Sequence, residues 1–388
     1  MPEECIALPT EFDPEDEYRP EPEPEPQPPA WMDGRIRIGI HTSIAGSYLN
    51  ALESARKLGC NALQIFSASP RMWQGGLARI PDLDAIAFRA KREELRLGPL
   101  VIHANYLINL AAAQPMLRTR SIQAFHDEIV RGVTLGADFL VVHPGARGER
   151  GAGQGIATIV ESVKQATKRV PVGELKILIE NTAGMGTAIG ARLEEVGEII
   201  GGLLRDLPAG ACLDTAHLFA AGYDIKSESG LTATISQIES TVGLENVPVF
   251  HVNDSKIALG GRVDRHEHIG KGRIGKEAFA RILQHPELSG PAREGRPGRA
   301  FLAETPIDDP GDDRRNVAML WELAGLRNQA PAADKGFSML TPALKKKIQK
   351  RISLQRSQRT QRRNKKDSKG RSGGRKLARA TRGSRRKR

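Results

Sequence analysis

The sequence has little cysteine, few aromatic residues and no long apolar run. Its three cysteines, Cys5, Cys60 and Cys212, form no CxxC pair, which argues against a disulfide framework and fits a reducing compartment. Aromatic residues make up 4% and hydrophobic residues 39% of the 388 residues, so part of the chain is expected to stay outside a packed core. The acidic, proline-containing N-terminus is unlike a signal peptide, and without a run of about 18 apolar residues no membrane span is predicted.

Acidic and basic residues are distributed unevenly along the chain. Residues 1–33 carry eleven Asp and Glu against Arg19, whereas residues 341–388 carry 21 Lys and Arg against Asp367. The formal net charge of +12 therefore belongs to the C-terminal tail, because residues 34–340 carry only +2. Such an asymmetry indicates a polyanionic partner for the tail.

Composition predicts three parts in the chain. Residues 1–34 are expected to be a disordered acidic arm, because the alternating Pro and Glu residues over 20–26 suit neither a helix nor a strand. Residues 35–330 are expected to be one folded domain. Residues 331–388 are expected to be a linker followed by a disordered tail rich in Lys and Arg.

The central part contains eight short apolar runs, separated by longer stretches with helical spacing such as 157–169 and 193–204. Continuous apolar runs of this length are typical of buried parallel strands. Eight strand–helix units in about 270 residues predict a (β/α)₈ TIM barrel, and an open doubly wound sheet is the alternative. The predicted strands are Ile36–Thr42, Ala62–Ser67, Leu100–Asn105, Phe139–Pro144, Lys176–Asn181, Ala211–Thr215, Val247–Asn253 and Ala300–Thr305.

From the third strand onward, nearly every predicted strand ends in a residue type that binds metal ions. The C-terminal ends of barrel strands open onto one face, so these side chains are expected to converge although they are distant in sequence. Imidazoles and carboxylates without thiolates are typical of a catalytic zinc, manganese or magnesium site, and nine ligands suit two or three ions rather than one. The nine candidates are His103, His143, Glu180, Asp214, His217, His251 and Glu304 at strand ends, with Asp264 and His266 added by the loop after the seventh strand.

Single members of this set have structural explanations as well. Asp214 and His217 have the spacing of a helix cap, and residues 264–266 fit a solvated turn. Buried carboxylates gathered at one rim, however, would repel one another without a cation. The set as a whole therefore favours a metal centre.

The motifs at these strand ends closely resemble those of the endonuclease IV family (AP endonuclease family 2, in the xylose isomerase-like TIM-barrel superfamily). The likeness runs from about Arg35 to about Leu326, and it departs from the usual pattern at Ala104, Asn105 and Gly261 without removing a candidate ligand. The motifs are His103-Ala104-Asn105-Tyr106-Leu107-Ile108-Asn109, Glu180-Asn181-Thr182-Ala183-Gly184, Cys212–His217 with Phe219–Asp224, His251–Lys256 with Arg262–His266, and Glu304-Thr305.

The resemblance implies a cluster of three zinc ions, with manganese an alternative at one position. It implies a zinc-dependent AP endonuclease of base excision repair, which cuts double-stranded DNA 5′ to an abasic site and leaves a 3′-OH and a 5′-deoxyribose phosphate. A zinc-activated water is the implied nucleophile. By motif, the first zinc would be held by His103, His143 and Glu180, the second by Glu180, Asp214, His251 and Glu304, and the third by His217, Asp264 and His266, with Glu180 as the catalytic bridging ligand.

The resemblance also assigns contacts with DNA. Arg71 would fill the gap left by a flipped-out nucleotide, while Tyr106 and Leu107 would wedge the base step. Unstacking costs least at an abasic site, which gives selectivity. Lys256 and Arg265 are expected to contact phosphate groups, and His41, Ser43 and Asn253 are expected to contact phosphate or support the ligands.

Two other functions remain open at the level of sequence. A sugar isomerase or epimerase of the same superfamily would hold one ion with Glu180, Asp214, His251 and Glu304, which leaves the other five candidate ligands unexplained. A non-enzymatic nucleic-acid-binding protein would act through its basic tail, and the intact ligand set speaks against it.

The tail over 341–388 lies outside the region of likeness. Its basic residues predict a nonspecific DNA tether, and residues 385–388 also fit a nuclear signal. The expected location is the cytoplasm, associated with the nucleoid, in a prokaryote, and the nucleus in a eukaryote. The resemblance implies a monomer.

Overall fold

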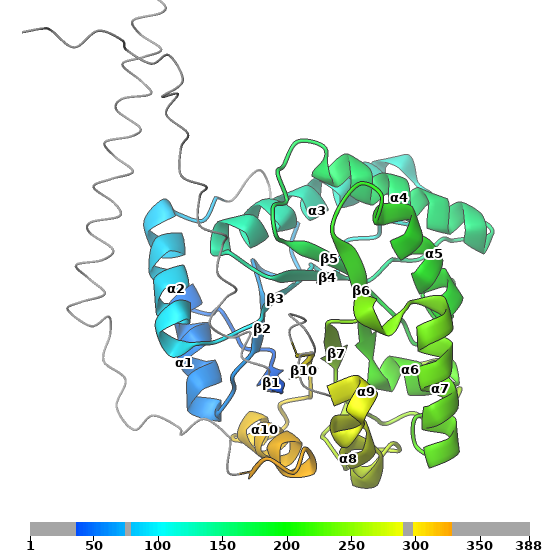
Figure 1. Ribbon diagram of the computed structural model, residues 1–388. Coiled ribbons are helices and arrows are strands. Elements are labelled where there is room, and N and C mark those ends of the chain that lie inside the picture. Colours follow the sequence, from blue (N-terminus) through cyan, green and yellow to red (C-terminus); the bar gives the residue numbers. More distant parts are fainter. Residues whose placement is uncertain (1–35, 74–78, 290–297, 328–388) are drawn as a thin grey trace, which may run out of the picture.

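The computed structural model describes residues 36–73, 79–289 and 298–327 (Figure 1). The predicted acidic arm, the predicted basic tail and both expected boundaries of the central domain lie outside these residues. The described residues form a ring of parallel strands with helices around it.

Eight parallel strands form one sheet, in the number that the apolar runs predicted. Neighbours along the sheet follow the order β1-β10-β7-β6-β5-β4-β3-β2, so each strand pairs with the strand of the adjacent strand–helix unit. This order confirms the TIM barrel and excludes a doubly wound sheet, in which the order reverses at a switch point. The strands are β1 (Arg37–Ile40), β2 (Leu63–Phe66), β3 (Leu100–His103), β4 (Phe139–Val142), β5 (Lys176–Glu180), β6 (Ala209–Asp214), β7 (Val249–His251) and β10 (Ala300–Ala303).

The barrel closes between β1 and β2, where His41, the residue after β1, forms an isolated parallel bridge with Gln64. At the C-terminal end of these strands the Thr42 amide donates to the Gln64 carbonyl at 2.8 Å. At their N-terminal end the Ala62 amide donates to the Ile38 carbonyl at 3.3 Å. Gly39 permits this approach, because a Cβ there would meet the Ala62 oxygen at 2.2 Å.

Side chains alternate along each strand between the barrel interior and the surface beneath the helices. A small buried apolar cluster fills the interior, whereas the residues between its members belong to the larger core under the helices. The interior is therefore packed with side chains up to the level at which the strands end. The interior cluster consists of Ala62, Val101, Phe139, Val141, Leu178, Cys212, Val249, Ala300 and Leu302.

The helices cover the outside of the barrel (Figure 1). Their ends are capped locally: Ser47 accepts from the Asn50 amide before the first helix, and Gly59 ends that helix with a φ of 85°. The helices are α1 (Tyr48–Leu58), α2 (Asp82–Leu95), α3 (Pro115–Leu135), α4 (Ala152–Thr167), α5 (Leu193–Leu203), α6 (Thr215–Ala221), α7 (Glu228–Thr241), α8 (Lys276–Gln284), α9 (Pro286–Ser289) and α10 (Asp312–Leu323), with the 3₁₀ turn η1 (Leu244–Asn246) before β7.

Several element boundaries differ from those predicted. The helix expected over 157–169 begins at Ala152, because Ile156 is buried in the core and extends the packed face toward the N-terminus. The sixth strand begins at Ala209 rather than at residue 211, and His217 lies in α6 rather than at a strand end. The loop after β7 contains a short antiparallel pair, β8 (Asp254–Ser255) and β9 (His266–Glu267), which sequence periodicity did not predict.

Cys60 and Cys212 are free and buried, and Cys5 lies outside the described residues. Among the helices of the described ranges, none is long and apolar enough to cross a membrane.

Candidate metal centre

Seven polar side chains form one layer at the C-terminal mouth of the barrel. Each stands two positions after an apolar residue of the interior cluster, so the alternation of the strand turns it inward as well. The pairs are Val101 with His103, Val141 with His143, Leu178 with Glu180, Cys212 with Asp214, Val249 with His251, Leu302 with Glu304 and, on β2, Ala62 with Gln64.

Glu180 lies at the centre of this layer and is fully buried. Its Oε2 is 3.1 Å from His103 Nε2 and 3.4 Å from His143 Nε2, while its Oε1 is 2.8 Å from His251 Nδ1. One carboxylate thus faces imidazoles on both sides. These side chains form two groups, and within each group the possible ligand atoms all lie within 4.8 Å of one another. The first group is His103, His143 and Glu180, and the second is Glu180, Asp214, His251 and Glu304.

A third group forms where α6 follows β6 directly. Asp214 Oδ1 accepts from the His217 amide at 2.9 Å, so this residue caps the helix and also belongs to the cluster. His217 Nε2 is 3.2 Å from Asp264 Oδ2, and His266 Nε2 is 3.3 Å from Asp264 Oδ1. His266 Nε2 is also 3.6 Å from Asp214 Oδ2, and atoms of Asp214, His217 and His266 lie within 4.8 Å of one another. The structure therefore brings together all nine predicted side chains and adds Asp214 to the third group.

Four of the five imidazoles are oriented by an oxygen that can only accept a hydrogen bond. The ring nitrogen that faces such an oxygen carries the hydrogen, so the other nitrogen of the neutral ring directs its lone pair at the carboxylates. The four pairs are His103 Nδ1 with the Ala104 carbonyl at 2.8 Å, His217 Nδ1 with the Asn181 carbonyl at 3.0 Å, His266 Nδ1 with the Glu304 carbonyl at 3.0 Å, and His251 Nε2 with Gln64 Oε1 at 2.8 Å.

Two of the inward lone pairs have no hydrogen-bond partner. His217 Nε2 and His266 Nε2 are buried, and the oxygens of Asp214 and Asp264 approach them without the alignment of a hydrogen bond. A buried nitrogen left unsatisfied costs about 1–3 kcal/mol, and coordination to a cation removes that cost. A donor set of imidazoles and carboxylates fits divalent ions such as zinc or manganese.

The charges of the cluster also favour a bound cation. Burial alone would raise the pKa of Glu180, but the facing imidazoles of His143 and His251 hold it well below its usual range. Burial alone would lower the pKa of His217, yet the carboxylates of Asp214 and Asp264 raise it to about 10. Burial alone would raise the pKa of Asp264, but the imidazoles of His217, His266 and His143 hold it at about 2. The carboxylates therefore stay ionised, and the cluster attracts positive charge, either as protons or as metal ions.

The segment after β7, which supplies Asp264 and His266, also carries two exposed cations beside the site. The Lys256 amide donates to the Arg265 carbonyl at 3.0 Å, and both of these side chains are exposed. Asp254 does not join the metal cluster. Its buried carboxylate accepts instead from the backbone amides of residues 255, 272, 274 and 275, at 2.8 to 3.3 Å.

Three of the side chains predicted to contact DNA lie on two neighbouring rim loops. Arg71 is exposed on the loop after β2, and Tyr106 and Leu107 follow β3. Tyr106 is 60% exposed, although its ring packs edge-on against Phe66 with centroids 5.2 Å apart. Leu107 is half-buried.

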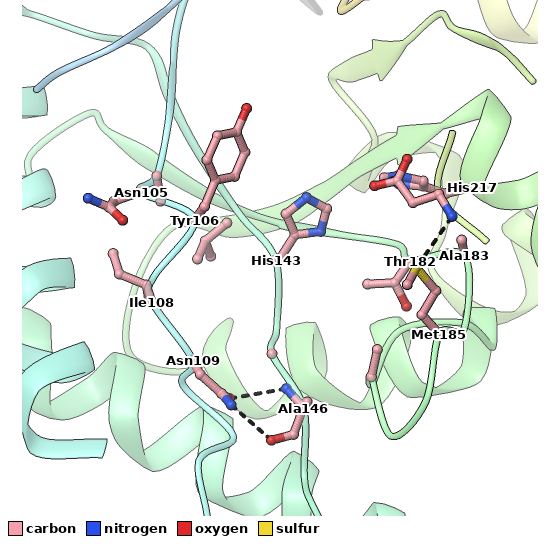
Figure 2. A pocket seen from close by; sticks show the side chains of 15 residues that line it. Asn105, Tyr106, Ile108, Asn109, His143, Ala146, Thr182, Ala183, Met185 and His217 are labelled. Atoms are coloured by element: carbon pink, nitrogen blue, oxygen red, sulfur yellow. Dashed lines mark hydrogen bonds and ion pairs between the residues drawn. The ribbon is translucent and has the colours of Figure 1, made fainter. Parts of the chain in front are cut away.

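A cavity of about 410 Å³ opens beside the imidazoles (Figure 2). Tyr106 and Ile108 form part of one wall, His143 lies in the middle, and His217, Thr182 and Met185 lie on the opposite side. At the base, Asn109 bonds both the amide and the carbonyl of Ala146, which ties the loop after β3 to the loop after β4. The cavity thus combines an apolar wall with candidate metal ligands.

Gln64 is a site residue that the sequence analysis missed. Besides accepting from His251, its amide nitrogen donates to Glu304 Oε1 and bonds His41 Nδ1 at 3.1 Å. A signal was present, because Gln64 is the polar residue within the apolar strand β2 and is fully buried. Asn253, predicted to support the ligands, bonds Asp214 Oδ2 at 2.6 Å through its amide nitrogen.

Fold and site together define a TIM barrel with a cluster of imidazoles and carboxylates at its C-terminal rim that could hold metal ions. Residues 52–305 match the family described as xylose isomerase-like TIM barrel. A protein of Solibacter usitatus named "Probable endonuclease 4" is 47% identical over 300 residues, which cover 76% of this chain and 100% of that protein. A protein of the same name from Chloroflexus aurantiacus is 38% identical over 74% of this chain and 98% of its own length. The chain belongs to the endonuclease IV family, as its motifs predicted.

Solved structures agree with this assignment. Endonuclease IV from Thermus thermophilus is 37% identical, with a TM-score of 0.65 over 74% of this chain and 99% of that structure. A D-tagatose 3-epimerase-like protein is 17% identical, with a TM-score of 0.55 over 75% of this chain and 98% of that structure. At that identity the second likeness shows a shared barrel fold and no more.

Proposed function

We propose that this chain uses divalent metal ions at the rim cluster to hydrolyse DNA on the 5′ side of abasic sites. Membership of the endonuclease IV family makes the chain a hydrolytic DNA endonuclease. The proposal adds the metal ions, the abasic site as substrate, and the residues that bind the ions and the DNA. The observation that carries it is the pair of buried, unpartnered nitrogens, His217 Nε2 and His266 Nε2, which face carboxylate oxygens.

Three groups of side chains would hold the ions, in the assignment that the motifs implied. Glu180 suits a bridging position, because Oε2 faces His103 and His143 while Oε1 faces His251. Three zinc ions, with manganese an alternative at one position, match three groups. Divalent ions held there would polarise the phosphate and lower the pKa of a water molecule toward neutrality.

The reaction balances without a protein general acid. The water oxygen bonds to phosphorus, the bond from phosphorus to the 3′-oxygen breaks, and the proton that the water loses is balanced by one that the 3′-oxygen takes from solvent, so the products are a 3′-OH and a 5′-deoxyribose phosphate. The buried carboxylates stay ionised at neutral pH, because the surrounding imidazoles lower their pKa. The carboxylate ligands are therefore already deprotonated when a metal ion binds.

The exposed residues around the mouth supply the DNA-binding surface of this proposal. The exposed Arg71 and Tyr106 and the half-buried Leu107 lie on adjacent loops, so they would contact one stretch of duplex. Lys256 and Arg265 are exposed cations on the segment after β7 and suit backbone phosphate. Selectivity for an abasic site follows from the low cost of unstacking there.

A sugar isomerase or epimerase is the competing function within this fold. It requires one ion, which Glu180, Asp214, His251 and Glu304 can hold. It gives no reason for the orientation of His103 toward Glu180, or for the unpartnered nitrogens of the third group. The arrangement therefore favours a multinuclear site.

One experiment separates these functions. An oligonucleotide duplex with a single abasic site is incubated with the full chain, with and without a chelator, and metal content is measured on the same preparation. Cleavage 5′ to the site, abolished by chelation, with close to three ions per chain, is expected. One ion per chain and no cleavage would instead support the sugar enzyme.

The proposal also includes the basic tail, residues 341–388, as a tether to DNA. The 21 basic residues of 341–388 are expected to bind phosphate without sequence preference. We expect the enzyme to act as a monomer on double-stranded DNA, and sedimentation of the protein with and without duplex measures this.

A further inference from the structure

We propose that Asn105 is a positioning residue that holds the two DNA-contacting loops in one fixed arrangement before DNA binds. The inference rests on the proposed function, because it takes Arg71, Tyr106 and Leu107 as the side chains that enter the DNA. Asn105 is 8% exposed and is one of the residues that line the cavity, but in Figure 2 its side chain points away from His143. Its role is therefore to orient other residues rather than to contact the reacting atoms.

The contacts of Asn105 join the two loops directly. Its amide nitrogen donates to the carbonyl of Ser69 at 3.1 Å and to that of Met72 at 3.0 Å. These two carbonyls bracket Arg71 in the chain, so the bonds fix the backbone on both sides of that residue. A third bond between the loops runs from the Tyr106 amide to the Pro70 carbonyl at 3.2 Å.

The other end of the same side chain shapes the loop after β3. Asn105 Oδ1 accepts from the Leu107 amide at 2.7 Å, which forms a local turn through Tyr106. A side chain at this position needs two donors and one acceptor with the reach of an amide, and asparagine supplies them. Asparagine at position 105 thus suits two loops of which one carries Arg71 and the other carries Tyr106 and Leu107.

Aromatic contacts fasten the outer edges of both loops. The guanidinium of Arg120 on α3 lies over the Trp73 ring, 4.5 Å from its centroid, immediately after the bracketed segment. Tyr106 packs against Phe66 at the end of β2. With Asn105 in the middle, the exposed tips of Arg71, Met72 and Tyr106 extend from a fixed base. Fixing a binding loop in advance lowers the entropic cost of association.

The test compares Asn105→Ala and Asn105→Asp with Asn61→Ala. Asn61 is a matched control, because its amide also donates to a carbonyl of a neighbouring segment, Ile36, at 2.9 Å and accepts from the Ile38 amide at 2.7 Å. These bonds lie at the opposite end of the barrel. Asn105→Asp keeps the acceptor for the Leu107 amide and loses both donors to the loop after β2.

The first readout is hydrogen exchange of the DNA-free protein, followed on peptides that contain residues 69–73 and 104–109. Faster exchange in both Asn105 variants, and no change there in Asn61→Ala, is expected. Unchanged exchange in Asn105→Ala would overturn the inference. This readout does not depend on the reaction, so it judges the contact even if the proposed function fails.

The second readout is steady-state cleavage of a duplex with one abasic analogue. Both Asn105 variants are expected to raise KM by about tenfold with kcat within about threefold, because the loops must order on binding. Wild-type KM in Asn105→Asp, or an equal rise in Asn61→Ala, would overturn the inference. Absence of cleavage by the wild-type chain would instead overturn the proposed function.

Discussion

Glu180 presents one carboxylate oxygen to each of two groups of imidazoles, so its charge serves both. We expect Glu180→Gln to lower cleavage of abasic DNA on the order of 10³-fold or more, because an amide of the same size cannot bridge two cations. Circular dichroism is expected to stay unchanged, since the strand and its packing are kept. Cleavage of the duplex at a wild-type rate would refute the assignment of this residue.

Gln64 orients His251 through a hydrogen bond of 2.8 Å, and its amide nitrogen holds Glu304. We expect Gln64→Met, which keeps the volume, to lower activity or metal affinity by roughly 10- to 100-fold, as is usual for groups that orient ligands. Gln165→Met is the control, because Gln165 is exposed on α4 and bonds Glu161 on the surface. Equal losses in the two variants would show that Gln64 does no more than a surface glutamine.

Residue types at strand ends were sufficient to place six of the nine candidate ligands at the mouth, because inward alternation and the common barrel face are properties of any strand of this kind, whereas His217 in α6 and Asp264 and His266 after β7 were predicted from the motifs. Gln64 was not predicted, since a search for imidazoles and carboxylates passes over an amide that orients them. The sharing of Asp214 between two groups was also not predictable. It depends on α6 starting directly at the end of β6, which brings His217 to the carboxylate that His266 approaches from β9.

At the scale of elements, the short pair β8 and β9 and the turn before α8 depend on Asp254. Its carboxylate accepts four backbone hydrogen bonds in a buried position. Asp254→Asn is expected to destabilise the protein by about 2–4 kcal/mol, because an amide nitrogen cannot accept from two of these donors. Chemical denaturation measures the loss.

The matched comparison for that loss is Asp224→Asn. Asp224 also accepts backbone amides, from Lys226 and Ser227, but it lies on the surface. Water replaces lost bonds there, so a change below about 1 kcal/mol is expected. Similar losses at the two positions would contradict the role of burial at Asp254.

The eight strands were predictable from apolar runs, whereas the β8 and β9 pair was not. Each of these two strands has only two residues, which is too short for a periodic pattern. Helix starts were less predictable than strand positions, because tertiary burial of Ile156 outweighs the glycine-rich sequence before it. The arm and the tail lie outside the described residues, and the predictions about them stay predictions.

At the scale of the whole molecule, metal-free and metal-loaded protein are expected to respond to pH in opposite ways. The His217 pKa is raised to about 10 by carboxylates in the folded protein, against an unfolded value of about 6.5. The folded metal-free protein therefore holds more protons between these values, and its stability is full below about pH 6.5 and falls as pH rises toward 10. Metal binding needs deprotonated imidazoles, so the loaded protein gains from higher pH.

Melting temperatures between pH 6.5 and 9 measure this contrast with and without a chelator. A decline for the metal-free protein, and a widening gap in favour of the loaded protein, is expected. His217→Gln is expected to flatten the decline. A metal-free protein that becomes more stable over this range would contradict the charge arrangement of the site.

The tail is expected to affect binding and not chemistry. Deleting residues 341–388 removes 21 positive charges, and each phosphate contact contributes a slope of about −0.9 to the dependence of log K on log salt. Weaker DNA binding with a flatter salt slope is expected, while turnover at saturating substrate stays close to that of the full chain. An unchanged slope would show that the tail makes no contact with phosphate.

Three of the oriented imidazoles depend on main-chain carbonyls, those of Ala104, Asn181 and Glu304. No codon change removes a carbonyl, so these three orientations survive substitution of the residues that supply them as long as the backbone keeps its path. His251 depends on the side chain of Gln64. In an evolving lineage, position 64 is thus where a single point mutation can release an imidazole of the cluster while every metal-binding residue stays in place.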